Sequence, residues 1–68
     1  MTLRQLIEKA EIFVKDTITK YPLLKSDIIE LLMLFYSEIE EEGCSPMREY
    51  GLMVDSINEL IEENDKNI

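Results

Sequence analysis

The chain has 68 residues, no histidine and a single cysteine, Cys44. A chain of this length forms one domain at most, and a lone cysteine excludes an internal disulfide. Without histidine the chain has neither a Ser-His or Cys-His nucleophile nor the usual donors of a zinc site, so we expect no enzyme activity, no metal and no cofactor.

The net charge of −8 is unevenly distributed along the chain. Residues 1–25 carry five basic and three acidic side chains, for a net charge of +2, whereas residues 26–68 carry two basic and twelve acidic ones, for −10. Such a charge repels nucleic-acid phosphates and anionic membranes, so we expect no direct binding to either. It attracts basic surfaces, and a protein with a basic surface is the expected partner.

The first predicted helix spans residues 3–20. Thr2 and Gln5 form a capping box at its start, and Pro22 ends it by forcing Tyr21 out of the helical conformation. One inward stripe recurs at helical spacing and contains Leu3, Leu6, Ile7, Ala10, Val14, Thr17, Ile18 and Tyr21. The outer face carries three i, i+4 charge pairs, Arg4–Glu8, Glu11–Lys15 and Asp16–Lys20.

The second predicted helix covers about residues 23–42. It begins either with Pro22 as a first-turn residue or with a capping box at Asp27 and Glu30. Its larger apolar group contains Leu24, Ile28, Leu31, Leu32, Phe35 and Ile39, and its smaller group contains Ile29, Met33 and Tyr36. The two groups lie about 110° apart around the axis, so we expect this helix to lie centrally and to contact two others.

The smaller apolar group of the second helix allows two interpretations. It packs in the core against the third helix, or it stays exposed as a contact face for a partner or a second copy. Three more apolar residues fall singly on the polar sides of their helices: Ile12, Leu34 and Leu52. Single exposed apolar residues are ordinary, and only their gathering on one side of the bundle would indicate a surface.

The third predicted helix spans residues 46–64. Gly43 suits the left-handed conformation that stops the preceding helix, and Ser45 followed by Pro46 is an N-cap with a first-turn proline. The inward side chains are expected to be Met47, Tyr50, Met53, Val54, Ile57, Leu60 and Ile61. We expect residues 65–68 to fray.

Three helices with short connections predict one all-α domain over residues 1–68, an up-down-up three-helix bundle. A helical hairpin that dimerises satisfies the same pattern, so a dimeric form is kept as an alternative. The N-terminal segment is too charged for a secretory signal, and a single cysteine favours the cytoplasm of the cell or of an infected host.

Acidic side chains gather at the ends of the second and third predicted helices, where negative charge opposes the helix dipole. They are Glu38, Glu40, Glu41 and Glu42 in the first case, and Glu59, Glu62, Glu63 and Asp65 in the second. The repeated unfavourable placement indicates either a solubilising role or docking to a basic protein. The candidate partner-binding residues are Glu38, Glu41, Glu42 and Glu49, with Met33 or Tyr36 as apolar anchors.

The segment SEIEEEGCSPMREYGLMVDSINELIEE, residues 37–63, resembles small uncharacterised acidic helical proteins of tailed bacteriophages. Those proteins often show an acidic helix end, a Gly-x-Ser-Pro turn and a Glu-rich helix after it. The resemblance implies no particular site residues. It does imply a class of role, because many such proteins bind and redirect a host protein.

These observations lead to three hypotheses about function. The first is a small acidic protein-binding module with an accessory or regulatory role. The second is a structural protein that self-associates through the wide apolar arc of the second helix. The third is a DNA mimic that occupies the basic groove of a nucleic-acid-binding protein, and the net charge of +2 over residues 1–25 opposes it.

Overall fold

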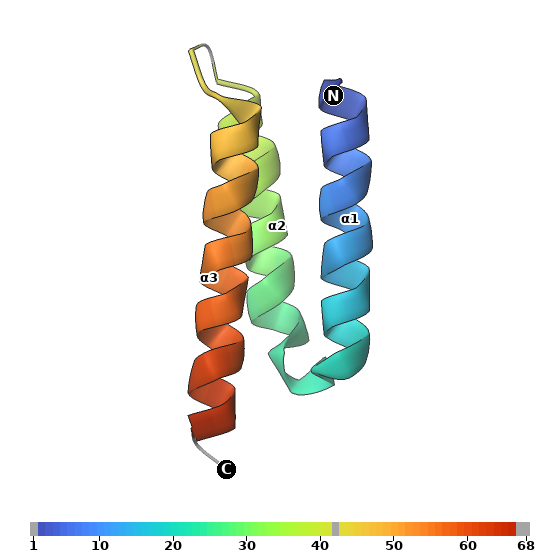
Figure 1. Ribbon diagram of the computed structural model, residues 1–68, viewed down its shortest axis with the longest axis vertical. Coiled ribbons are helices and arrows are strands. Elements are labelled where there is room, and N and C mark those ends of the chain that lie inside the picture. The colour runs from blue at the N-terminus through green and yellow to red at the C-terminus, as the bar shows by residue number, and fades with distance from the viewer. Residues whose placement is uncertain (1, 42, 67–68) are drawn as a thin grey trace.

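Three helices lie side by side in an elongated bundle of 40 × 18 × 17 Å. The computed structural model describes residues 2–41 and 43–66. The second helix runs antiparallel to the first and the third (Figure 1), so the predicted up-down-up three-helix bundle is confirmed. The elements are α1 (Leu3–Lys20), a 3-10 turn (Pro22–Leu24), α2 (Lys25–Ile39) and α3 (Pro46–Lys66).

The predicted capping box starts α1. The Thr2 hydroxyl oxygen accepts the Gln5 N–H at 3.2 Å, and the Gln5 side-chain oxygen accepts the Thr2 N–H at 2.9 Å. These bonds satisfy two backbone donors that the first helical turn leaves without partners. The helix ends at Lys20, as Pro22 predicts, and Tyr21 closes it with an N–H bond of 2.8 Å to the carbonyl of residue 17.

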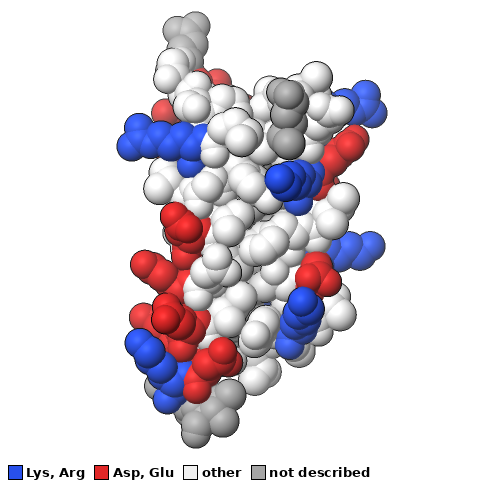
Figure 2. Space-filling model, in the orientation of Figure 1, with Lys and Arg blue, Asp and Glu red and all other residues white. Residues whose placement is uncertain are grey.

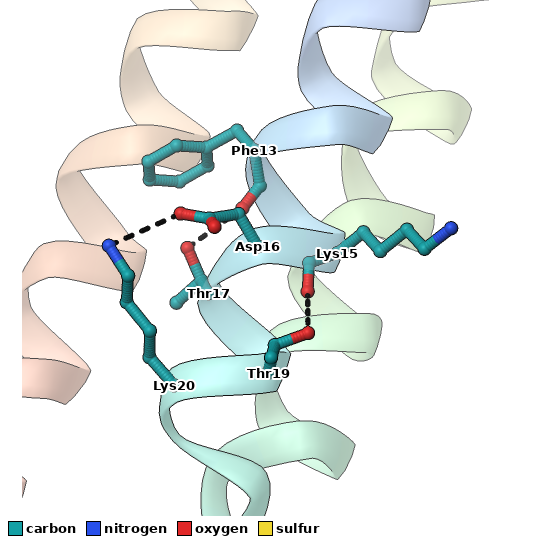
Figure 3. Close-up of polar contacts among 6 residues, drawn as sticks. All are labelled: Phe13, Lys15, Asp16, Thr17, Thr19 and Lys20. Atoms are coloured by element: carbon teal, nitrogen blue, oxygen red, sulfur yellow. Dashed lines mark hydrogen bonds and ion pairs between the residues drawn. The ribbon is translucent and has the colours of Figure 1, made fainter.

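Thr17 is a polar residue on the inward stripe of α1, where it is 5% exposed. Its hydroxyl donates to the Phe13 carbonyl at 2.8 Å (Figure 3), so burial leaves no donor without a partner. On the outer face, Asp16 and Lys20 form one of the predicted ion pairs at 3.3 Å. Arg4 and Glu8 form another at 3.6 Å.

The hydrophobic core lies where α2 packs against both other helices. Its buried apolar side chains are Leu6, Ala10 and Val14 from α1, Ile28 and Phe35 from α2, and Met53 and Ile57 from α3. Every member of the larger apolar group of α2 is buried in this core or packs against it. The predicted contact of α2 with both other helices is therefore confirmed.

A set of aromatic contacts joins all three helices toward the end of the bundle where α2 connects to α3. The rings of Phe35 in α2 and Tyr50 in α3 meet edge to face, with their centroids 6.4 Å apart. The Lys9 ammonium of α1 lies 5.5 Å from the centroid of the Tyr50 ring. The Tyr50 ring attracts the cation and also packs against Phe35, so Tyr50 helps to fix α1 against the other two helices.

The start of α2 follows the first of the two predicted alternatives. Pro22 opens a 3-10 turn, in which the Leu24 N–H donates to the Tyr21 carbonyl at 3.0 Å, and the α-helix continues from Lys25. Asp27 lies inside the first turn of α2 rather than before it, so no capping box forms there.

The end of α2 differs from the prediction, because the helix stops at Ile39 rather than near residue 42. The Glu40 N–H bonds to the carbonyl of residue 37 at 3.3 Å, and the Glu41 N–H bonds to that of residue 38 at 3.2 Å. These three-residue steps form a turn tighter than an α-helix. Glu38 and Glu40 still lie at the C-terminal end of α2, where negative charge is unfavourable.

The turn between α2 and α3 contains Gly43, whose φ of 81° lies in the left-handed region, as predicted. Cys44 follows it with a partly buried thiol, whose sulfur lies 3.4 Å from the Ile39 carbonyl and donates to it. This contact satisfies a carbonyl at the end of α2 that has no partner within the helix. Cys44 therefore has a structural place in the turn.

Pro46 starts α3, as predicted, and the Glu49 N–H donates to the Ser45 carbonyl at 3.0 Å. The helix continues to Lys66, two residues past the expected end. Residues 67 and 68 lie outside the described residues, so fraying of the tail stays a prediction.

Two residues of the predicted inward stripes lie at the surface instead. Leu3 and Met47 are exposed, and with Pro46 they line a small hollow of about 170 Å³ between the first turns of α1 and α3. Both residues lie in the first turn of a helix, where fewer neighbouring side chains can cover them than in the middle of the bundle. Helical spacing predicts the direction of a side chain but not how far the neighbouring helix extends.

Truncation of a core side chain should reveal how much of the stability depends on burial. Ile57 is fully buried, so Ile57→Ala should lower the free energy of unfolding by about 2–5 kcal/mol. Ile12 is 70% exposed, and Ile12→Ala, the same chemical change, should cost less than about 0.5 kcal/mol. Urea unfolding followed by circular dichroism measures both. Equal losses would contradict the described core.

The two glycines should respond in opposite directions to the same substitution. Gly43→Ala places a side chain at a φ of 81° and should cost about 1–2 kcal/mol, although no atom lies within 4 Å of the added carbon. Gly51 lies inside α3 with open space around it, so Gly51→Ala should gain about 0.5–1 kcal/mol through helix propensity. Urea unfolding of the two variants tests the signs, and a stabilised Gly43→Ala would contradict the left-handed turn.

Candidate functional site

A groove runs along the interface of α2 and α3, and none of its lining residues belongs to α1. It consists of two adjoining hollows with volumes of about 700 and 330 Å³. Leu31, Leu34 and Ser56 line both hollows, so the two are parts of one continuous depression. We call this depression the α2/α3 groove.

The floor of the α2/α3 groove is apolar. Leu31 and Leu60 are partly buried and pack against the core, which ties the floor to the rigid part of the bundle. Three further apolar side chains face solvent: Met33 is 64% exposed, Leu34 55% and Leu52 49%. Contiguous exposed apolar side chains of this kind mark contact surfaces more often than isolated ones do.

The rim of the α2/α3 groove is acidic. The larger hollow is lined by Asp27, Glu30, Glu59 and Glu63, and the smaller one by Glu38 and Glu49. Among the described residues that line the groove, none is Lys or Arg. On the face drawn in Figure 2, acidic side chains gather over the lower part of α3, whereas basic and acidic ones alternate along α1. The groove therefore combines an apolar floor with uncompensated negative charge.

The predicted partner-binding residues divide into two sets. Glu38, Glu49 and Met33 line the groove, so the structure brings these three together on one surface. Glu41 is exposed in the turn after α2 and is not among the lining residues. Glu42 lies outside the described residues. The acidic end of α3 also contributes to the rim through Glu59 and Glu63, which were predicted as part of a cluster but not as site residues.

Tyr36, the second predicted anchor, does not line the groove. It is partly buried, packs against the core and lies near Glu11 of α1. Burial raises the pKa of the Tyr36 hydroxyl above its ordinary value of 10.0. The Glu11 carboxylate raises this pKa further, as a nearby negative charge and as an acceptor for the hydroxyl proton. Tyr36 is therefore a contact between α1 and α2.

The smaller apolar group of α2 does not pack as one unit against α3. Tyr36 is turned toward Glu11 of α1, and Met33 is mostly exposed at the edge of the groove. Ile29 is partly exposed and is not among the side chains that pack on the core. The two interpretations of this group therefore divide among its members, because Tyr36 packs against the core whereas Met33 is exposed.

Leu34 and Leu52 are the site residues that helical spacing missed. Each falls alone on the polar side of its helix, yet both line the smaller hollow. The third residue of that kind, Ile12, lies on α1 and is not part of the groove. A signal was present in the sequence: both leucines lie nine residues from Gly43, the turn residue between the two helices. In an antiparallel hairpin, positions equally distant from the turn lie at the same level.

The rim carboxylates are spread along the groove rather than gathered at one point. Within residues 2–41 and 43–66, no three acidic or cysteine side chains lie close enough together to hold a metal ion. Separated carboxylates are suited instead to separate contacts with several cationic groups, each as a charge-assisted hydrogen bond. The chemistry offered by the groove is therefore apolar contact plus distributed negative charge.

No protein-family model, curated protein or solved structure matches this chain. In the part of the chain that the structure describes, the helices lack the combination of length and apolar character needed to cross a membrane. A functional assignment therefore depends on the groove itself.

The raised pKa of Tyr36 predicts how stability changes at alkaline pH. The neutral hydroxyl is favoured in the folded state, so its stabilising contribution is complete below the unfolded pKa near 10.0. The contribution is lost as the pH rises through the higher folded pKa. Tyr36→Phe should therefore lose less stability than the unsubstituted chain between neutral and strongly alkaline pH, in urea unfolding at a series of pH values.

Glu11→Gln tests whether the Glu11 carboxylate contributes to the raised pKa of Tyr36. Removing the carboxylate charge should move the pKa of Tyr36 back toward its ordinary value, which an absorbance titration of tyrosinate measures against Tyr36→Phe. If Glu11→Gln leaves the titration unchanged, the assigned contact between α1 and α2 is wrong.

Proposed function

We propose that the chain is a small protein-binding module that presents the α2/α3 groove to a partner. The observation that carries the proposal is the gathering of Met33, Leu34 and Leu52, all exposed, within one acid-rimmed depression. Leaving these side chains in water is unfavourable by roughly 25 cal/mol per Å² of apolar surface. A partner that covers them gains that free energy on binding.

The charge of the groove favours a protein partner over other classes of macromolecule. A nucleic-acid backbone or an anionic membrane would bring phosphates against a rim that carries six carboxylates. A protein surface with Lys and Arg side chains around apolar ones complements both the floor and the rim. The net charge of −8 of the whole chain also attracts basic proteins, and repels nucleic acids and anionic membranes, at longer range.

The proposed role is accessory or regulatory. A bundle of this size would act through its surface. It would alter the activity of its partner by covering one of the partner's own surfaces. The resemblance of residues 37–63 to small phage proteins, many of which bind and redirect host proteins, favours the same kind of role.

A charge placed on the groove floor should abolish partner binding without affecting the fold. Leu34→Glu puts a carboxylate at a position 55% exposed, and Ile12→Glu makes the same change at a position 70% exposed on α1. Immobilised unsubstituted chain and Ile12→Glu should retain the same proteins from a lysate of the source cell. Leu34→Glu should retain them at least about tenfold less, as expected for a central apolar contact.

Two outcomes would contradict this proposal. Retention of the same proteins by Leu34→Glu would place binding elsewhere on the molecule. A native mass above the monomer that falls on Leu34→Glu substitution, with no other protein retained, would assign the groove to contacts between copies. Circular dichroism of each variant verifies that the helices are intact.

A further inference from the structure

We infer that the occupant of the α2/α3 groove is a cationic amphipathic α-helix, which lies along the groove as a fourth helix of the bundle. This inference rests on the proposed function and adds the secondary structure and charge of the partner segment. Three features carry it: the shape of the groove, the position of its apolar side chains and the sign of its rim.

The shape of the groove fits a helix. It lies between two antiparallel helices, and α1 already packs in a groove of the same pair of helices, on core residues such as Ile28 and Ile57. The lining residues of α2 extend from Asp27 to Glu38, which at 1.5 Å per residue is about 17 Å, or three turns of a helix. A helix packed between two others is the ordinary way to extend such a bundle.

The apolar side chains define where the partner helix makes contact. Leu31, Leu34 and Ser56 lie in the middle of the groove, because they line both hollows. Ser56 is small, so it leaves room at the centre for a larger side chain of the partner. Leucine or methionine residues spaced i, i+3, i+4, i+7 and i+11 on the partner would reach this floor along its whole length.

The rim determines the charge of the partner. Carboxylates lie at both ends of the groove, Glu59 and Glu63 in the larger hollow and Glu38 and Glu49 in the smaller one. Lys or Arg side chains that flank the apolar stripe of a helix extend past the floor and reach such a rim. A helix with these flanks therefore satisfies both parts of the groove at once.

A second copy of the chain is a poor occupant on the same grounds. A symmetric contact through the groove would place the six rim carboxylates of one copy against the same six of the other. Each chain also carries a net charge of −8, so copies repel one another, most strongly at low salt. The occupant is therefore a segment of a different, basic protein.

Three synthetic peptides test the inference with the full chain. The first contains leucine and lysine, with the leucines on one helical stripe. The second has the same composition in an order that destroys the stripe, and the third has glutamate in place of every lysine. Fluorescence anisotropy of the labelled peptides should show binding of the first only, and its affinity should fall as salt is added.

Charge-matched variants separate the groove from the general acidity of the chain. Glu30→Gln, Glu59→Gln and Glu63→Gln combined remove three charges from the rim. Glu41→Gln, Glu62→Gln and Asp65→Asn combined remove three charges from exposed positions that do not line the groove. The rim variant should bind the first peptide about tenfold more weakly, whereas the control variant should stay within about threefold of the unsubstituted chain.

Equal weakening by the two triple variants, or equal binding of the scrambled peptide, would overturn the inference, because attraction would then depend on total charge. Binding of the glutamate peptide as tight as that of the lysine peptide, and lost in Leu34→Glu, would overturn the cationic part alone and leave the proposed function intact. If Leu34→Glu changes neither peptide binding nor retention of cellular proteins, both the inference and the proposed function are wrong.

Discussion

The packing of α2 against two helices at once is the constraint on which the rest of the structure depends. The chain has no internal disulfide and is too short for a large core, so most of its stability must come from helix burial. Ile28 and Phe35 supply that burial from α2, and they need α1 on one side and α3 on the other. The wide apolar arc of α2 is therefore what requires a three-helix bundle rather than a single hairpin.

The same constraint explains why a groove is left open. Each pair of neighbouring helices in a bundle offers a depression on both sides of their contact, and one added helix covers only one of them. In this chain α1 covers one side of the α2/α3 pair, and Leu34 and Leu52 remain on the other. Glu38 and Glu49 line the same hollow as these two leucines, and their charges oppose association of the apolar strip with copies of itself.

Most of the fold could be predicted because it depends on local rules. The capping box at Thr2, the prolines and the apolar spacing act within a few residues, and the number and order of helices follow from them. The end of α2 at Ile39 was missed because the chain forms a tight turn over residues 37–41, which helical spacing does not reveal. The groove was missed because it depends on the register between two helices. Treating each helix separately cannot show that Leu34 and Leu52 share a surface, whereas counting outward from Gly43 does.

The short connections between the helices have a consequence for how the molecule assembles. The links over residues 21–24 and 40–45 join helices that are adjacent in both sequence and space, and most contacts are local. Helical chains with such low contact order fold within microseconds to milliseconds, since little loop entropy is lost before contacts form. The groove is built entirely from one continuous hairpin, residues 25–66. Its walls and floor come together when that hairpin closes, so folding and acquisition of the surface are a single event.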